Sequence, residues 1–338
     1  MALTVLLQTA ARRLPGFGEW YAVTVYPALV RVVGAFFGMF SFSVVEFGLY
    51  LLLIGMAWHG IRQIRRPGKL LMGAGLLASI LVFVYTANCG INYHRRPFSS
   101  YLNLNVRESS AEELERLAGF LAGQVKETAP VEGSASGTEG GPAQDVLARQ
   151  ARADMERLGE RYPSLSGYYP LPKPVTVSEI LSYQSLSGVY SPFTIEANYN
   201  SDMTAYNIPH TACHELSHLR GFMREEEANF IGYLACVNSD SRYSRYSGYL
   251  TGFLYVNQAL FSQKPEQAAQ LAASLPETVR KDLAENNRFW ERYEGKIAEV
   301  STKVNDTYLK ANRQADGVKS YGRMVDLLLA FYRENEPE

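Results

Sequence analysis

The chain has 338 residues and a formal net charge of -1, which allows one sizeable domain and a smaller region. Because there is no basic surplus, nucleic acid is excluded as a class of partner. Three cysteines, Cys89, Cys213 and Cys236, are too few and too oddly spaced for a disulfide framework or a cysteine zinc site.

The first 95 residues contain long uncharged runs. Residues 70–91 carry no charge and exceed the roughly 18 to 20 residues that cross hydrocarbon as a helix. Residues 43–61 are nearly as apolar, with polar groups only near the ends. We predict two transmembrane helices here, so that residues 1–95 anchor the chain in a lipid bilayer. Residues 32–42 are apolar but too short to span, which suits an interfacial or re-entrant piece.

A short basic turn separates the two predicted spans, with Arg62, Arg65, Arg66 and Lys69. The positive-inside bias places such a turn in the cytoplasm. The protein is then a multi-pass protein of the cell membrane, and the region after the second span is extracytoplasmic. Arginines on the other flanks of the spans reduce this charge contrast.

Residues 96–338 have the composition of a folded domain outside the membrane. Apolar spacing and β-branched content predict two helices and two short strands, at residues 109–126, 145–158, 175–177 and 193–199. The first helix begins with a Ser-Ala-Glu-Glu capping box. A Gly, Ser and Glu-rich stretch at about 128–144 predicts a mobile loop. Because the pattern beyond residue 242 is mostly helical, the fold class is α+β and mostly α.

The segment HELSH places His214, Glu215 and His218 in an HExxH pattern. On a helix, residues i and i+4 share a face, so the two imidazoles suit one tetrahedral zinc ion. A carboxylate beside them can take a proton from a metal-bound water and pass it to the leaving amine. The pattern therefore predicts metal-assisted peptide hydrolysis, against the alternative of a surface helix with two solvated histidines.

A catalytic zinc needs a third protein ligand and an open position. Gly221 can end the motif helix in a left-handed turn, after which a second helix begins with Glu225, Glu226 and Glu227. We predict Glu225 as the third ligand, and the next two glutamates remain alternatives. Asn229 lies one turn after Glu225 and is the candidate partner that orients a ligand.

Two other residues adjoin the motif. His210 lies four residues before His214, behind a proline at the helix start, and we assign it a capping or substrate-binding role. Cys213 falls on a different helical face and is expected to be a buried thiol.

These segments resemble known zinc enzymes. HELSH followed by REEEANF is similar to the gluzincin branch of the zincin metallopeptidases, in which the third ligand opens a Glu-x-x-Ala-Asn/Asp helix; this pattern marks Glu225. GVYSPFTIEANYN, HTACHELSHLRGFMREEEANFIGYLAC, YSGYL, GINYHRRP and DGVKSYGRMVDLLL resemble an uncharacterised bacterial family of membrane-anchored zincin-like proteins. The N-terminus is shorter than that family usually carries.

The resemblance implies further site residues. Zincins have an edge strand above the motif helix that pairs with an extended substrate, which points to residues 193–199 and to Asn198 as a substrate clamp. A donor to the oxyanion is also expected, with Tyr321 as the first candidate and Arg323 as the second. An ordinary short strand with polar edges is the alternative for residues 193–199.

The sequence as a whole predicts a zincin-like domain that binds one zinc ion per chain and hydrolyses a protein or peptide substrate at the membrane surface. The competing hypothesis is a non-catalytic membrane scaffold or binding protein in which the zinc is structural.

Overall fold

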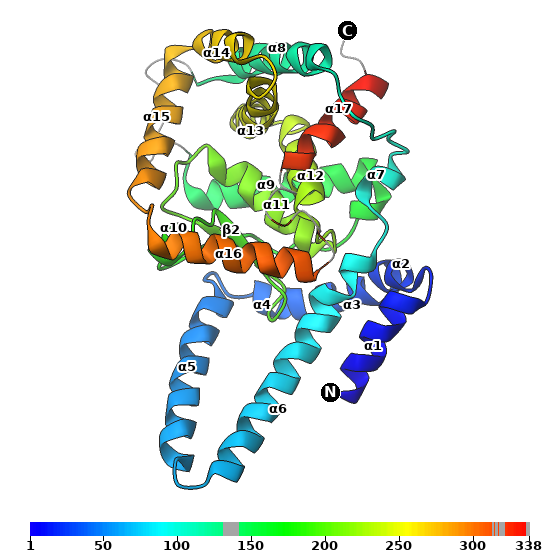
Figure 1. Cartoon of the computed structure of the whole chain (residues 1–338), viewed down its shortest axis with the longest axis vertical. Coiled ribbons are helices and arrows are strands. Elements are labelled where there is room, and N and C mark those ends of the chain that lie inside the picture. The colour runs from blue at the N-terminus through cyan, green and yellow to red at the C-terminus, as the bar shows by residue number, and fades with distance from the viewer. Residues whose placement is uncertain (131–141, 313, 315–316, 318–321, 336–338) are drawn as a thin grey trace.

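The computed structural model describes residues 1–130, 142–312, 314, 317 and 322–335. Within these residues the protein is mostly helical with one small sheet (Figure 1). This confirms an α+β class in which helix predominates. Of the loop expected at about 128–144, residues 131–141 lie outside the described residues.

Three helical stretches are long and apolar enough to cross a membrane, namely Phe17–Gly38, Val44–Gln63 and Pro67–His94. The second and third contain the two spans predicted from the sequence. Helix α5 (Val44–Gln63) and helix α6 (Pro67–Tyr85) form an antiparallel hairpin that projects from the rest of the protein (Figure 1). The basic turn is at the tip of this hairpin, far from the larger domain.

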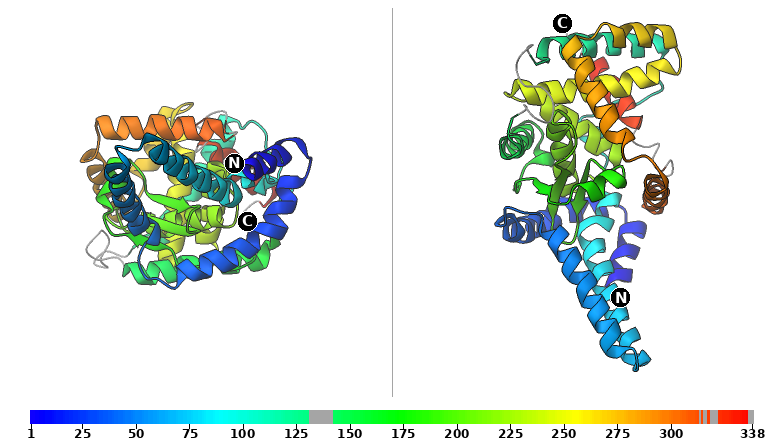
Figure 2. Two further views of the ribbon diagram at one scale, coloured as in Figure 1. Left: turned by 90° about the horizontal axis from the view of Figure 1, so that it is seen from below. Right: turned by 90° about the vertical axis from the view of Figure 1, so that its left-hand side faces the viewer.

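The first apolar stretch differs from the expectation of a short segment at residues 32–42. The chain is helical from Phe17 to Gly38. Glu19 and Arg31 interrupt the apolar pattern of this stretch but do not end the helix. It lies across the base of the larger domain instead of continuing the hairpin (Figures 1 and 2). Its parts are α2 (Phe17–Trp20), η1 (Tyr21–Val25), α3 (Tyr26–Leu29), η2 (Val30–Gly34) and α4 (Ala35–Gly38).

The larger domain is built mainly from helices, and its predicted helices are present. Helix α8 (Ala111–Thr128) begins with the expected capping box between Ser110 and Glu113, and α9 (Gln144–Arg161) matches the second prediction. The other helices, before and within this domain, are α1 (Ala2–Arg13), η3 (Thr86–Gly90), η4 (Asn92–His94), α7 (Phe98–Tyr101), η5 (Pro163–Leu165), α10 (Glu179–Tyr183), α11 (Asn207–Leu219), α12 (Glu225–Val237), α13 (Arg242–Phe261), α14 (Pro265–Ala273), α15 (Glu277–Glu291), α16 (Lys296–Ala311) and α17 (Met324–Glu334).

The sheet has three strands in the order β1-β3-β2. Strand β1 (Lys173–Val175) is parallel to β3 (Glu196–Asn200), and β2 (Gly188–Ser191) is antiparallel to β3. Strand β2 was not predicted. The strand predicted at 193–199 begins later because Ile195 has a left-handed backbone, with φ of 51°, which no regular strand accommodates.

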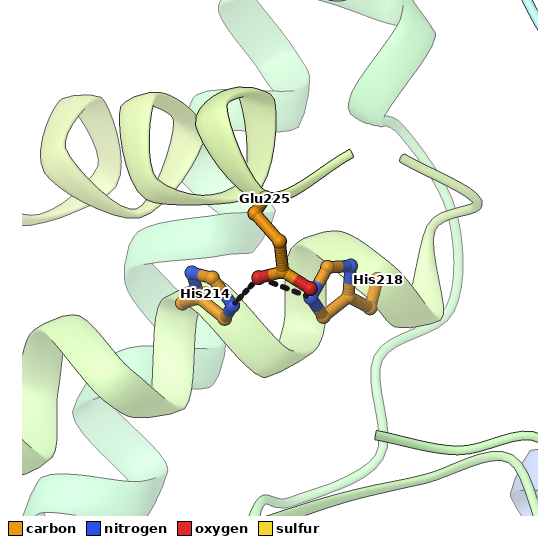
Figure 3. A group of neighbouring side chains, drawn as sticks. All are labelled: His214, His218 and Glu225. Atoms are coloured by element: carbon orange, nitrogen blue, oxygen red, sulfur yellow. Dashed lines mark ion pairs between the residues drawn. The ribbon is translucent and has the colours of Figure 1, made fainter. Parts of the chain in front are cut away.

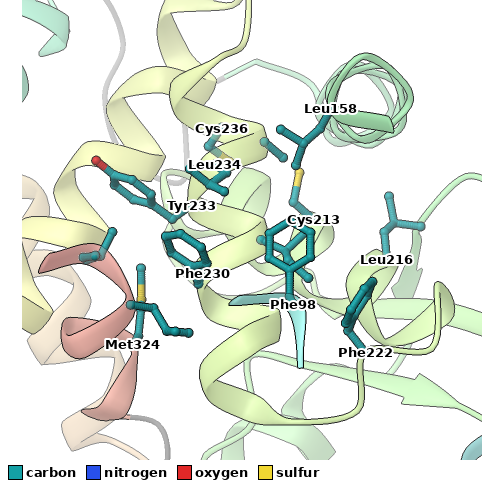
Figure 4. Packing of buried hydrophobic residues seen from close by; sticks show 14 of the residues in the cluster. Phe98, Leu158, Cys213, Leu216, Phe222, Phe230, Tyr233, Leu234, Cys236 and Met324 are labelled. Atoms are coloured by element: carbon teal, nitrogen blue, oxygen red, sulfur yellow. The ribbon is translucent and has the colours of Figure 1, made fainter. Parts of the chain in front are cut away.

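Helices α11 and α12 form the centre of the domain. Every residue from Ile208 to Leu219 and from Glu225 to Cys236 is buried. Figure 4 shows the apolar side chains packed between these helices and their neighbours, among them Leu216, Phe230 and Met324. Cys213 is a free, buried thiol in this core, as predicted. The motif helix is therefore held on all sides, which fixes the positions of its polar residues.

Buried carboxylates tie the start of α5 to the sheet. Glu196 of β3 accepts hydrogen bonds from the amides of Val44 and Val45 at 3.1 and 2.9 Å, and Lys173 of β1 pairs with the same carboxylate. Glu46 of α5, in turn, accepts hydrogen bonds from the main-chain amides of Thr176 and Val177, which follow β1, at 2.7 and 2.9 Å. The hairpin and the sheet are thus joined by charge-assisted hydrogen bonds.

Candidate metal centre

Three side chains from the two central helices converge on one point (Figure 3). His214 and His218 project from the same face of α11, with ring centroids 4.7 Å apart. The Nε2 atoms of these rings lie 3.3 and 3.6 Å from the Oε2 atom of Glu225, at the start of α12. Among the described residues these three form a buried group that could hold a metal ion.

Hydrogen bonds on the far side of each ring fix its orientation. The Nδ1 atom of His214 lies 2.8 Å from the side-chain oxygen of Asn229, and that of His218 lies 2.8 Å from the carbonyl oxygen of Phe222. Because both partners are acceptors, each Nδ1 carries the proton and donates it. Both rings then direct their Nε2 atoms toward Glu225, which is the orientation that a metal-binding histidine needs.

The connection between the helices explains how Glu225 reaches the histidines. Gly221 has a left-handed backbone, with φ of 91°, and ends α11 as predicted. The turn brings the Phe222 carbonyl onto His218 and reverses the chain, so that α12 starts beside the motif.

The three successive glutamates have different partners. The Glu226 carboxylate accepts hydrogen bonds from the side chains of Gln314 at 2.8 Å and Arg323 at 3.2 Å. The Glu227 carboxylate accepts a hydrogen bond from the main-chain amide of Phe98 at 2.8 Å. In the described part of the chain, only Glu225 of these three belongs to the group around the histidines that could hold a metal ion.

The electrostatics of the group suit a cation. Burial alone would raise the pKa of Glu225, but His218 and His214 lower it below its ordinary value, so the carboxylate is charged. Burial lowers the pKa of His218, and the opposing charge of Glu225 outweighs this effect and raises it to about 9. A positive charge between these side chains is therefore favoured.

The two distances from Glu225 can be compared with the coordination of zinc. Zinc lies about 2.0 to 2.1 Å from imidazole nitrogens and carboxylate oxygens, so two tetrahedral ligands are roughly 3.3 Å apart. The two distances from Glu225 to the histidines, 3.3 and 3.6 Å, are close to this value. Two imidazoles and one carboxylate form a donor set that zinc accepts, and they leave a fourth position for another ligand.

Glu215 lies beside this group in a cavity of about 820 Å³ that His214, His218 and Glu225 also line. Burial raises the pKa of Glu215, and the two histidines oppose this effect. Gly188 of β2 makes room for the carboxylate, because a Cβ atom at this position would lie 2.6 Å from its Oε1 atom. No motif or periodicity singles out Gly188 before the structure is known.

Asn198 is not on an edge strand. It lies in β3, the central strand of the sheet, is fully buried, and donates to the carbonyl oxygen of Val189 at 3.3 Å. The expectation that residues 193–199 form an edge strand is therefore wrong. The edge strand that contacts α11 and lines the cavity is β2. Local patterns could not reveal this, because strand order depends on long-range pairing.

His210 lines the same cavity as the ligands. Its Nε2 atom lies 3.1 Å from the carbonyl oxygen of Asn229, and burial together with His214 lowers its pKa to about 4. It is a neutral side chain within the site, and its predicted substrate-binding role stays a prediction.

The two predicted oxyanion donors differ in their placement. Tyr321 lies outside the described residues. Arg323 pairs with Glu226 and is absent from the described residues that line the cavity. Tyr255 of α13 does line it, and burial together with Glu225 raises its pKa to about 12. Nothing in the sequence distinguishes Tyr255 among 22 tyrosines.

The fold and the site define a mostly helical protein with apolar N-terminal helices and a buried group of two histidines and one glutamate that could hold a metal. The chain belongs to the family described as "Protein of unknown function (DUF3810)", which matches residues 21–329. This agrees with the resemblance to an uncharacterised family. No curated protein and no solved structure matches the chain. The match includes the apolar helices as well as the site.

Proposed function

We propose that this protein is a membrane-anchored zinc metallopeptidase of the zincin type. The observation that carries the proposal is the convergence of His214, His218 and Glu225 at metal-ligand spacing, with Glu215 beside them in an open cavity. Structural zinc sites are closed by four protein ligands, whereas catalytic sites keep one position free. Three protein ligands facing a cavity therefore favour catalysis.

Each residue of the site has a role in this proposal. A zinc ion held by the three ligands would polarise the substrate carbonyl and lower the pKa of a water molecule. Glu215 takes the proton of the attacking water and delivers it to the nitrogen of the leaving amine. Tyr255 remains a neutral phenol at physiological pH, since its pKa is about 12, and its hydroxyl can donate a hydrogen bond to the oxyanion.

The substrate in this proposal is an extended stretch of polypeptide. Strand β2 is at an edge of the described sheet and lines the cavity through Gly188, Val189 and Tyr190. A peptide that adds to this edge forms main-chain hydrogen bonds and passes the ligands.

We place catalysis at the extracytoplasmic surface of the cell membrane. The basic turn of the α5–α6 hairpin lies at the end farthest from the larger domain (Figure 1). If the hairpin crosses the bilayer with its basic turn in the cytoplasm, the site lies on the other side.

The test uses the full chain in detergent or nanodiscs. We expect about one zinc per chain by elemental analysis and hydrolysis of some members of a peptide panel. Glu215→Gln should keep the metal and lose activity by about 100-fold to 10,000-fold, whereas Glu225→Gln should lose the metal. Glu226→Gln changes the same atoms one residue from a ligand and should retain both.

A wild-type chain that binds no zinc would contradict the proposal. A chain that holds zinc but cleaves no peptide, or one in which Glu215→Gln cleaves as well as wild type, would favour a scaffold or binding protein with a structural metal.

A further inference from the structure

Helix α16 (Lys296–Ala311) has an apolar face that the described structure leaves uncovered. Ile297, Val300 and Val304 are 59, 59 and 64% exposed. Their spacing of three and four residues places them in one stripe along the helix. Apolar side chains of this size are rarely left in water as a continuous row.

The C-terminal end of the stripe meets the helical stretch that leads into the hairpin. Tyr308 continues the stripe by one more turn, and the Tyr308 hydroxyl accepts hydrogen bonds from the hydroxyls of Tyr85 and Tyr93 at 3.3 Å each. Both partners belong to the helical stretch Pro67–His94, at its end next to the domain. Figure 1 shows α16 running across the lower edge of the domain, at the level where α5 and α6 join it.

Charged residues follow the stripe in a regular order around α16. Lys296, Lys303 and Lys310 recur every seven residues, so they lie along one flank of the stripe at about 100° of rotation per residue. Glu299 and Asp306 lie further round, on the side away from the apolar residues. An apolar stripe flanked by lysines is the pattern of helices that lie in the membrane interface, where lysine stems extend toward the headgroups.

The helical stretch Phe17–Gly38, at the base of the domain, also exposes large apolar side chains. Val32, Phe36 and Met39 are 70, 54 and 72% exposed, and this helix lies at a similar level to α16 (Figure 1). The α16 stripe alone is too small to hold a second copy of the chain. Three aliphatic side chains expose much less surface area than the roughly 800 Å² that each partner buries in a stable interface.

We propose that α16 lies in the surface of the bilayer that the hairpin crosses, with Ile297, Val300 and Val304 inserted at the boundary between headgroups and acyl chains. On the other flank of the stripe from the lysines, α16 bears Ser301, Asn305 and, further round, Thr302, which line the cavity of the metal centre. One helix thus carries both the apolar stripe and part of the cavity wall. If the proposed peptidase activity holds, its substrates are segments of polypeptide at the membrane surface.

The test measures depth and does not depend on catalysis. The native cysteines are buried, so single nitroxide labels can be attached to Ile297→Cys, Val300→Cys and Val304→Cys in the full chain. Glu299→Cys is the matched control on the same helix. Collision with oxygen and with a water-soluble nickel complex is compared in nanodiscs that contain a fraction of anionic lipid.

We expect the three stripe labels to collide more with oxygen and less with nickel than the control label. If all four labels are equally accessible to nickel, the stripe faces water and the proposal is wrong. If spin–spin broadening shows that labels from two chains meet, a second copy covers the stripe and the proposal is also wrong. Three label positions keep the test decisive if one variant fails to fold, and a positive result would stand even for a protein without hydrolytic activity.

Discussion

The hydrogen bond between Asn229 and His214 gives the sharpest test of the metal centre. Asn229 is buried, and its side-chain oxygen lies 2.8 Å from the Nδ1 atom of His214. In Asn229→Ala the histidine loses this acceptor, so a buried donor is left unpaired and the ring is free to turn away from Glu225. The contact between His210 and the main-chain carbonyl of residue 229 does not need the side chain and should remain.

The size of the effect follows from the lost bond. An unpaired buried donor costs about 1 to 3 kcal/mol, and loss of a group that orients a metal ligand weakens metal affinity by about 10-fold to 100-fold. The two ranges agree, since 1.4 kcal/mol is a factor of 10. We therefore expect zinc affinity to fall by about 10-fold to 100-fold in Asn229→Ala.

The assay is competition for zinc between the purified full chain and a chromogenic chelator. Asn229→Asp keeps an acceptor at the same place and should bind zinc at least as well as wild type. Tyr255→Phe removes the hydroxyl that accepts from the Asn229 amide at 3.4 Å, and should leave affinity unchanged. If Asn229→Ala folds with a normal melting temperature and binds zinc like wild type, the orienting role is refuted.

Three further outcomes are expected. Gly188→Ala places a Cβ atom 2.6 Å from Glu215; peptidase activity should fall by about 100-fold with zinc retained, and unchanged activity would show that Glu215 has room to move. The Arg333 guanidinium lowers the pKa of Glu113 from 4.5 to about 2, so this contact stabilises the fold above pH 4.5 and is lost as the pH falls toward 2. The difference in free energy of unfolding between wild type and Arg333→Ala, about 1 kcal/mol or less at neutral pH, should shrink over that range; a difference independent of pH would remove the contact as its cause. An impermeant maleimide should label Arg65→Cys at the hairpin tip only after cells are opened, and labelling of intact cells would reverse the proposed orientation.

The convergence of His214 and His218 was predictable because its geometry is local. Two histidines four residues apart share a helical face in any α-helix, and a glycine three residues later allows the reversal that brings the next helix back. The choice of Glu225 over its neighbours came from the resemblance to gluzincins, because helical phase says only that residues one apart point about 100° away from each other.

The walls of the cavity were not predictable in the same way. Gly188 and Tyr255 reach the site through pairing and packing between segments far apart in the chain, which no local periodicity records. Asn198 was placed on an edge strand because zincins have such a strand above the motif helix. Neither that resemblance nor the local strand pattern at residues 193–199 encodes which neighbour each strand pairs with. Residues 32–42 were expected to form a short interfacial or re-entrant piece because the apolar run there is too short to span, whereas the helix begins at Phe17 and continues through Arg31.

The boundary at residues 95 and 96 separates two compositions but does not separate two cores. Tyr26, Ile91 and Tyr93 precede it, yet they belong to the same buried cluster as Leu216 of the motif helix. On the opposite side of the sheet, Glu196 holds the first amides of α5 in a buried network. Strand β3, which carries Glu196, pairs with β2 beside Glu215. The membrane-side helices and the metal centre are therefore parts of one packed structure, and a chain cut at this boundary would lose side chains that support the motif helix.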